Sequence, residues 1–402
     1  MDRKKNIPQI RFQNYEDEWV YSTIGRHISL LNGRAYKQEE LLDEGKYRVL
    51  RVGNFNTNSK WYYSNLELED NKYVNKGDLL YLWATNFGPE IWTEEKAIYH
   101  YHIWKLEFDK TDINQDYLYI WLESDKNKIQ QNTNGSTMVH ITKNMMEERR
   151  ISLPTQDEQS AIGSLFHTLD DLLASYKENL SNYQSLKATM LSKMFPKAGQ
   201  TVPEIRLDGF EGEWVEKRLK DISKRVTRKN NGLVSERALT ISAQFGLIDQ
   251  EEFFQKKIAS KDVSGYYLIK KGEFAYNKSY STGYPLGAIK RLDKYENGVL
   301  STLYILFKAV DVDSDYLAHY YESDKWHREV SMCAAEGARN HGLLNIAPAD
   351  FFNTRLVIPK ELEEQQAIGS YFSNLDNLIN SHQEKISQLE TLKKKLLQDM
   401  FI

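Results

Sequence analysis

Two stretches of this chain have apolar residues at every third or fourth position over a long distance. They span residues 158–195 and 364–401, and the spacing places their apolar residues on one stripe of a helix. At 1.5 Å per residue, each helix would be roughly 57 Å long. Such a stripe cannot be buried within its own helix, so the pattern predicts that the two helices pack antiparallel against each other. The predicted contact residues are Ile162, Leu165, Leu169, Leu172, Leu180 and Leu186 on the first helix and Ile368, Leu375, Leu378, Ile386, Leu389 and Leu392 on the second.

The two helical stretches are also copies of each other. They align without a gap at an offset of 206 residues, with 18 of 38 positions identical. Residues 7–20 match residues 202–215 in the same way, with seven of 14 positions identical. The repeat therefore predicts two copies of one unit, each a globular domain followed by a long helix. The expected domains are 1–153 and 201–358, and the expected helical segments are 154–200 and 359–402.

The globular domains have the pattern of a mixed α/β fold. Short runs rich in β-branched and aromatic residues predict strands, and two apolar-polar runs predict short helices. The strands are expected at 48–52, 79–84, 102–108, 238–242 and 300–307, and the helices at 117–124 and 316–323. Between these matched elements the two copies differ strongly, for example at 53–75 against 241–270. A shared framework with divergent loops is typical of two modules that do one kind of job on different targets.

Composition and motifs narrow the function mainly by exclusion. The chain has 402 residues and a formal net charge of −4, so any nucleic-acid surface must be local. Cys333 is the single cysteine, which excludes an intramolecular disulfide and a cysteine-based zinc site and favours a reducing cytoplasm. No apolar run is long enough to span a membrane. The sequence contains no GxxxxGK[ST], GxGxxG or HExxH motif, nor the Asn-Pro-Pro-aromatic motif of DNA amino-methyltransferases, so we expect no catalytic site or metal.

Several polar stretches have the composition of nucleic-acid contacts. Cations contact phosphates, and arginine and amide side chains recognise base edges. Some of these stretches occur at matched positions of the repeat, which strengthens the interpretation, although each could also be a solvated loop. The candidate residues are Arg51, Asn54, Asn56, Lys60, Thr85 and Asn86 in the first copy and Arg225, Arg228, Lys229, Asn230, Asn277, Lys278, Ser279, Tyr280, Arg339 and His341 in the second.

The repeated motifs resemble the specificity subunit of type I restriction–modification systems over essentially the whole chain. The resemblance rests on the PEIRLDGFEGEW opening of the second copy and its counterpart PQIRFQNYEDEW in the first. It rests also on the EQ-x-AIGS start of each long helix, on LSKMFPK at 191–197 and on EGAR at 336–339. The family implies two target-recognition domains in inverted, pseudo-twofold arrangement, joined by two antiparallel helices.

The resemblance also implies a role and a set of partners. Each domain would recognise one half of a bipartite site in double-stranded DNA, and the helices would set the spacing and dock two modification subunits. The chain itself would have no cofactor. S-adenosylmethionine would be bound by the modification subunits, and ATP and magnesium by the restriction subunits. Two other hypotheses remain open at this point: a self-contained DNA-modifying enzyme, and a two-module scaffold that does not bind DNA.

Overall fold

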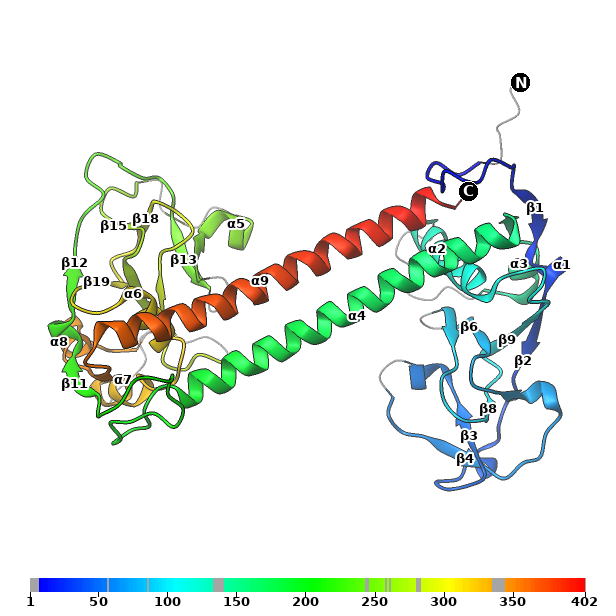
Figure 1. Cartoon of the computed structure of the whole chain (residues 1–402), viewed down its shortest axis with the longest axis horizontal. Helices are drawn as coiled ribbons and strands as arrows, with labels where there is room; N and C mark the ends of the chain where they lie inside the picture. The colour runs from blue at the N-terminus through cyan, green and yellow to red at the C-terminus, as the bar shows by residue number, and fades with distance from the viewer. Residues whose placement is uncertain are drawn as a thin grey trace. The chain divides into compact units, whose positions relative to one another are not determined.

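The chain forms two compact units, each with one globular part and a portion of both long helices. The computed structural model describes residues 7–55, 58–84, 87–132, 141–242, 246–256, 259, 262–279, 283–334 and 344–401. Unit 1 comprises residues 1–177 and 384–402, and unit 2 comprises residues 178–383. The long helices are α4 (Gln156–Lys193) and α9 (Leu362–Asp399), with 38 residues each (Figure 1). The two predicted helices are therefore confirmed, with both ends about two residues earlier than expected.

Unit 1 contains two four-stranded sheets and a two-stranded ribbon. The first sheet is antiparallel and has the order β2 (Ile28–Asn32), β9 (Ile103–Phe108), β6 (Leu79–Leu82), β7 (Gly88–Ile91). The second has the order β4 (Tyr62–Ser64), β3 (Tyr47–Leu50), β8 (Ala97–Tyr99), β5 (Tyr73–Val74), and its β3–β8 pair is parallel. The ribbon joins β1 (Val20–Thr23) and β10 (Arg150–Leu153). The described helices of this globular part are α1 (Ile24–His27), α2 (Gln115–Asn132) and α3 (Lys143–Glu147).

Unit 2 repeats this topology. Its four-stranded antiparallel sheet has the order β12 (Ser223–Val226), β19 (Ile305–Ala309), β16 (Phe274–Asn277), β17 (Ala288–Arg291). The pairs β13 (Leu239–Ser242)–β14 (Gly246–Asp249) and β15 (Tyr267–Lys270)–β18 (Asn297–Leu300) correspond to the second sheet. A parallel bridge from Ala238 to Val299 takes the place of the β3–β8 pair. The ribbon is β11 (Val215–Arg218)–β20 (Arg355–Ile358), and the described helices are α5 (Gln250–Phe254), α6 (Ser314–Tyr320), α7 (His327–Cys333) and α8 (Pro348–Phe352).

One predicted strand is wrong. The expected strand at 300–307 is the end of β18 and the start of β19, which belong to different sheets. A turn separates them, and the amide of Tyr304 donates to the carbonyl oxygen of Ser301 at 3.1 Å. The run from Leu300 to Phe307 is rich in apolar and β-branched residues, and residues of that kind do not reveal a turn that contains neither glycine nor proline.

The motifs shared by the two copies form one anchor in each unit. The guanidinium of Arg11 donates to both carboxylate oxygens of Glu158, at 2.7 and 2.8 Å, and the indole nitrogen of Trp19 donates to the same carboxylate at 3.1 Å. In unit 2, Arg206 and Trp214 bind Glu364 with distances of 2.8, 2.8 and 3.1 Å. Both glutamates are buried. A buried carboxylate requires this complete set of donors, so the motifs serve to fix each long helix to its domain.

The two helices pair antiparallel within each unit. In unit 1, Asp170 and Lys177 of α4 form ion pairs with Lys393 and Glu390 of α9. In unit 2, Lys187 pairs with Asp376, and the ring of Tyr183 lies 5.2 Å from that of His382. Residue numbers fall along α9 as they rise along α4 in both units, which is the antiparallel order predicted from the sequence.

Four leucines assigned to this helix contact are exposed instead. Leu172 and Leu186 of α4 are 41% and 37% exposed, and Leu378 and Leu392 of α9 are 40% and 44% exposed. Leu173, next to Leu172, and Ile379, next to Leu378, are buried, with 7% and 9% exposure. Successive helical residues point about 100° apart, so only one of two adjacent apolar residues can face the partner.

The remaining predicted contact residues are buried to different degrees. Ile162, Leu169, Ile368 and Leu375 are buried, whereas Leu165, Leu180, Ile386 and Leu389 are half-buried. Phe166 and Phe372, which were not predicted as contacts, are fully buried at matched positions. Among the helices in the described ranges, none is both long and apolar enough to cross a membrane.

Candidate nucleic-acid interface

The second sheet of unit 1 carries cations that lie over aromatic rings, with Trp61 on one face of the sheet and Tyr47, Tyr62 and Tyr73 on the other. Lys46 lies 5.1 Å from the ring centroid of Tyr47, Arg48 lies 5.2 Å from that of Trp61, and Lys96 lies 4.0 Å from that of Tyr73. Arg51 and Lys60 lie 4.4 and 5.0 Å from the ring of Tyr62. We call these five cations and their rings the cation–aromatic surface. Alternating cations and aromatic rings suit a nucleic acid, because they offer charge to phosphates and flat faces to bases.

A depression of about 490 Å³ opens on this surface. Lys46, Arg48, Lys76 and Lys96 line it, together with Glu94 and Glu95. Lys46 pairs with Glu67 and Arg48 with Glu94, and all four side chains are at least 44% exposed. Exposed pairs of this kind are weak, so a phosphate could replace the carboxylate at small cost. Lys46, Arg48 and Lys96 were not predicted from the sequence, although Lys46 and Arg48 flank Tyr47 at the start of the predicted strand at 48–52.

The loop after β3 brings three predicted residues together. The side-chain amide of Asn54 donates to the carbonyl oxygens of Asn58 and Lys60, at 3.2 and 3.1 Å, and its oxygen accepts from the amide of Arg51 at 3.1 Å. Asn54 therefore shapes the loop, whereas Arg51 and Lys60 supply charge. Asn56 lies outside the described residues.

A second feature of unit 1 lies where β8 turns into β9. The rings of His100, Tyr101 and His102 lie 3.9 to 4.9 Å from one another, and the indole nitrogen of Trp83 donates to the carbonyl oxygen of Tyr101 at 2.8 Å. Burial lowers the pKa of His100 to about 4, assisted by His102 and Arg51, so this imidazole is neutral at physiological pH. A neutral imidazole in this turn suits contacts with bases more than with phosphates. Thr85 and Asn86, predicted close to this place, lie outside the described residues.

The end of β16 in unit 2 has the same backbone arrangement as the end of β6 in unit 1. The amide of Leu344 donates to the carbonyl oxygen of Lys278 at 3.0 Å, just as the amide of Ile141 donates to that of Trp83 at 3.5 Å in unit 1. The oxygen of the Asn277 side chain accepts from the amide of Ser279, and the ammonium of Lys278 donates to the carbonyl oxygen of Ile346. Burial lowers the pKa of Lys278. Tyr280, Arg339 and His341 lie outside the described residues.

The basic stretch at 224–230 is only partly available for DNA. Arg225 is exposed on β12, but Arg228 forms two hydrogen bonds with the buried carboxylate of Glu273, at 3.0 and 3.2 Å. Lys229 lies over Tyr267 and donates to the carbonyl oxygen of Gly265 at 2.7 Å. Asn230 is fully buried and bonds the backbone of Ser235. The prediction for Asn230 is therefore corrected: its side chain shapes a loop and cannot reach DNA.

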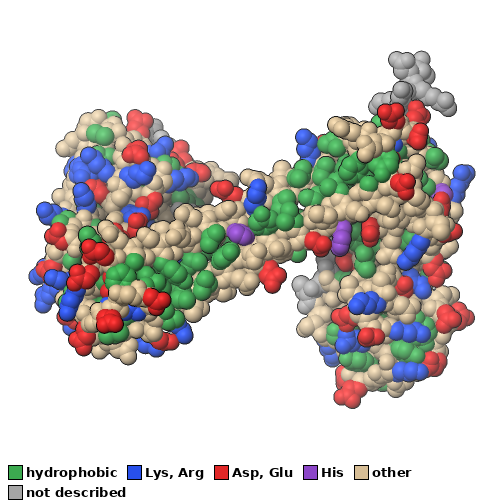
Figure 2. Space-filling model, viewed as in Figure 1, with side chains coloured by type: hydrophobic (Ala, Val, Ile, Leu, Met, Phe, Trp, Pro, Cys, Tyr) green, Lys and Arg blue, Asp and Glu red, His purple; other side chains and the backbone are tan. Residues whose placement is uncertain are grey.

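Unit 2 has a smaller cation–aromatic group whose residues were not predicted from the sequence. Arg237 and Lys294 lie 4.3 and 5.2 Å from the ring centroid of Tyr295. Arg237 is far from Lys294 and Tyr295 in the sequence, and the pairing of the strands brings it to them. In the view of Figure 2, cationic and anionic side chains are interspersed over both globular parts, in keeping with the small net charge.

One group of side chains in unit 2 has the composition of a metal site. Ligand atoms of His319, Glu322 and Asp376 lie within 4.8 Å of one another. However, the ammonium of Lys187 pairs with both carboxylates, at 2.7 and 2.5 Å, and Lys290 pairs with Glu322 at 3.3 Å. The protein thus supplies the cations itself. The lysines and His319 hold the pKa of Glu322 well below its ordinary value, although burial acts in the opposite direction. This group is an ion-pair network that ties α6, α4 and α9 together.

Comparison with known proteins gives consistent results. Residues 16–183 match a family model described as the type I restriction modification DNA specificity domain. The specificity subunit of the type I restriction enzyme MjaVIII from Methanocaldococcus jannaschii is 23% identical over 418 residues, which cover 98% of this chain and 95% of the relative.

Solved structures show the same fold. The S subunit of a type I restriction–modification system from M. genitalium is 16% identical, with a TM-score of 0.60 over 98% of this chain and 99% of that one. A chain from a structural study of complex assembly and conformational transition in a type I R-M system is 13% identical. Its TM-score is 0.53 over 95% of this chain and 97% of that one.

Proposed function

The chain belongs to the family of type I restriction–modification specificity subunits, and we propose that each of its two domains recognises one half of a bipartite DNA site. The observation that supports this most directly is the repeat in three dimensions. The two units share the strand order of their four-stranded antiparallel sheet, their ribbon and their Arg–Glu–Trp anchor, yet differ in the side chains on their surfaces. One scaffold with two different surfaces suits the recognition of two different short sequences. As a specificity subunit the chain selects the site and does not catalyse.

In unit 1, the cation–aromatic surface would contact the DNA backbone. Arg48, Lys60 and Lys96 would neutralise phosphates, and the turn at 100–102 would face base edges. In unit 2, Arg225, Arg237 and Lys294 would supply the phosphate contacts. Asn277 and Lys278 lie at the end of β16, which corresponds to the end of β6 at Trp83, beside the turn at 100–102. Phosphate contacts orient a protein on the duplex, whereas base contacts select the sequence, so the two groups should respond differently to substitution.

The exposed leucines of the long helices would dock the modification subunits. Leu172 of α4 and Leu392 of α9 are exposed in unit 1, and Leu186 and Leu378 in unit 2. Each unit thus has one exposed leucine on each long helix. The offset of 206 residues matches Leu172 with Leu378 and Leu186 with Leu392. Figure 2 shows hydrophobic side chains at the surface of the long helices within both units. Matched apolar patches in the two repeat units suit two copies of one partner.

The chemistry of the assembly would come from the partners. The modification subunits would bind S-adenosylmethionine and methylate adenine, and restriction subunits would use ATP and magnesium to translocate and cleave DNA. The specificity subunit would act in the cytoplasm, where the cell's DNA is accessible.

The decisive experiment maps methylated adenines in the genome of the host, with and without this gene. The proposal predicts that one interrupted, asymmetric motif loses methylation when the gene is deleted. Unchanged methylation would contradict it. Incubation of the purified chain with DNA and S-adenosylmethionine tests the self-contained enzyme and should give no methylation.

A matched pair of variants then tests the surface. Lys96→Ala should weaken DNA binding and flatten its dependence on salt, because a lysine–phosphate contact releases a counterion. Lys110→Ala removes an exposed lysine that lies outside the cation–aromatic surface and should leave both quantities unchanged. Equal behaviour of the two variants would show that this surface does not face DNA.

A further inference from the structure

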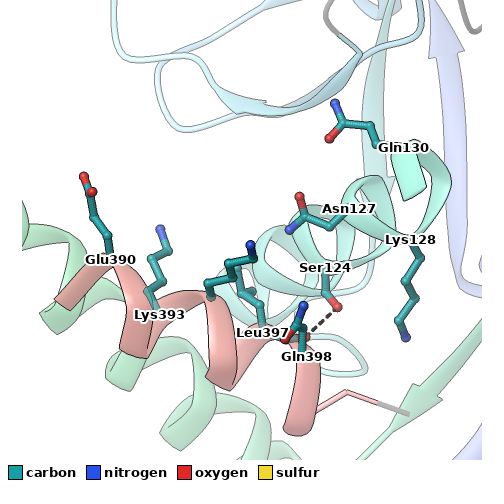
Figure 3. A pocket seen from close by; sticks show the side chains of 9 residues that line it. Ser124, Asn127, Lys128, Gln130, Glu390, Lys393, Leu397 and Gln398 are labelled. Atoms are coloured by element: carbon teal, nitrogen blue, oxygen red, sulfur yellow. Dashed lines mark hydrogen bonds between the residues drawn. The ribbon is translucent and has the colours of Figure 1, made fainter. Parts of the chain in front are cut away.

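A polar groove in unit 1 lies between α2 and the last turns of α9 (Figure 3). Its volume is about 760 Å³. The hydroxyl of Ser124 donates to the carbonyl oxygen of Leu397 at 2.9 Å, which fixes the end of α9 beside α2 and forms the floor of the groove. Eight of the nine lining side chains are polar or charged, and three of them are lysines. This composition does not suit an apolar ligand.

The charges in the groove favour an anion. Glu390 is the only acidic side chain among the described lining residues, and it forms an ion pair with Lys177 at 2.7 Å. Lys393 pairs with Asp170, whereas Lys394 has no ion-pair partner among the described residues. Burial lowers the pKa of Lys128, although the carboxylate of Asp125 acts in the opposite direction. The lining side chains thus include three lysines and one glutamate, and the lysines come from two different elements, α2 and α9.

The repeat offers an internal comparison for this groove. In unit 2 a depression of about 460 Å³ lies at the matched place, between α4 and the residues after α6. The offset of 206 residues matches Lys394 with Ala188 there, and the offset between Ser124 and Ser323 matches Lys128 with His327. Two lysines line this depression, and both are paired: Lys187 with Glu322 and Asp376, and Lys290 with Glu322. The scaffold forms without these cations in unit 2, so packing alone does not require them in unit 1.

Amide side chains complete the donor set. In Figure 3, Asn127 and Gln130 extend from α2, and Lys393 rises from α9. Lysine ammonium groups and side-chain amides are the donors that contact phosphate oxygens in protein–DNA complexes, and they position the duplex without selecting its sequence. In the matched depression of unit 2, Trp326 stands where Asn127 stands in unit 1, so this donor is lost as well.

We propose that the lysine groove of unit 1 binds the sugar–phosphate backbone of DNA and that unit 2 lacks this contact. The inference rests on the proposed function, because it assumes that the chain binds double-stranded DNA. It adds to that function a contact made by the long helix α9 and by α2, away from the sheets. This contact would raise the affinity for every DNA sequence alike and leave the choice of sequence to the other surfaces.

The test compares two neighbouring lysines in the full-length chain. Lys394→Glu reverses a charge that lines the groove, whereas Lys395→Glu makes the same change at an exposed position outside the groove. Dissociation constants are measured at several salt concentrations on two duplexes, one with the methylated motif of the host and one of unrelated sequence. We expect Lys394→Glu to reduce the slope of log K against log salt by about one on both duplexes. The ratio of the two affinities should not change, and Lys395→Glu should behave like the unaltered chain.

The outcomes separate this inference from the proposed function. If the slope for Lys394→Glu equals that of the unaltered chain while DNA is still bound, the groove proposal is overturned and DNA recognition stands. If the unaltered chain and the complex that it forms in its host bind neither duplex, the proposed function fails. If Lys394→Glu keeps the slope but no longer co-purifies with the modification subunits, the groove binds an acidic protein segment instead. Circular dichroism of both variants confirms that each remains folded.

Discussion

Leu172 and Leu173 are adjacent on α4, yet the structure assigns them opposite roles. Leu173 is 7% exposed and belongs to the packed side of the helix, whereas Leu172 is 41% exposed. Burying a leucine side chain contributes about 1.5–3 kcal/mol, and the cavity left by truncation adds to the loss. Leu173→Ala should therefore lower the free energy of unfolding by about 2–5 kcal/mol. Leu172→Ala should lower it by about 1 kcal/mol or less, because much of the side chain is already in water.

The assay is urea unfolding followed by circular dichroism, with both variants and the unaltered chain measured side by side. A second measurement distinguishes the roles further. Leu172→Asp should keep the urea midpoint close to that of Leu172→Ala but reduce co-purification with the modification subunits, because it places a charge in the proposed docking patch. If Leu172→Ala destabilises the chain as much as Leu173→Ala does, the assigned helix faces are wrong. If Leu172→Asp retains its partners, the exposed leucines do not dock them.

Three further predictions follow from the anchors, the ion-pair network and the repeat. Arg206→Ala leaves the carboxylate of Glu364 buried without its main partner and should lower the free energy of unfolding in urea by about 3–5 kcal/mol. Adding Glu364→Gln to the same chain should restore part of this loss. The pKa of Glu322 is lowered in the folded state, so its stabilising effect is present above the ordinary value of 4.5 and is lost as the pH falls below it. Glu322→Gln should therefore flatten the fall in thermal stability between about pH 5 and 3, and an unchanged profile would contradict the ion-pair assignment. Residues 1–200 alone expose the stripe of α4 and should associate as a twofold dimer, so a monomer at micromolar concentration in analytical ultracentrifugation would count against equivalent repeats.

The sequence predicted the long-range organisation better than the surface. The repeat and the three- and four-residue spacing indicated both helices and their antiparallel order, because a helix stripe must find a partner wherever it occurs. The choice between Leu172 and Leu173 could not be made, since both are apolar and only the three-dimensional register decides which one faces inward. The predicted strand at 300–307 is wrong for a similar reason, because a turn without glycine or proline cannot be recognised from the apolar pattern.

The candidate DNA surface shows a different limit of sequence reasoning. A run of cations such as 224–230 indicates charge but not availability, and Arg228 and Asn230 turned out to bind groups within unit 2. Conversely, Arg237 and Lys294 meet over Tyr295 only because strands far apart in the sequence are brought together. Composition identifies the residues that could contact phosphates, but the hydrogen bonds of the fold determine which of them remain available.

The twin anchors have a consequence for how the gene can change. Arg11 with Trp19 and Arg206 with Trp214 bind their glutamates in nearly the same geometry, so the two helix starts are interchangeable as binding partners. A crossover in the gene between the segments that encode α4 and α9 would leave every arginine and tryptophan with a glutamate to bind. Recombination at these segments can therefore delete, duplicate or exchange a whole domain without breaking the joint that holds it.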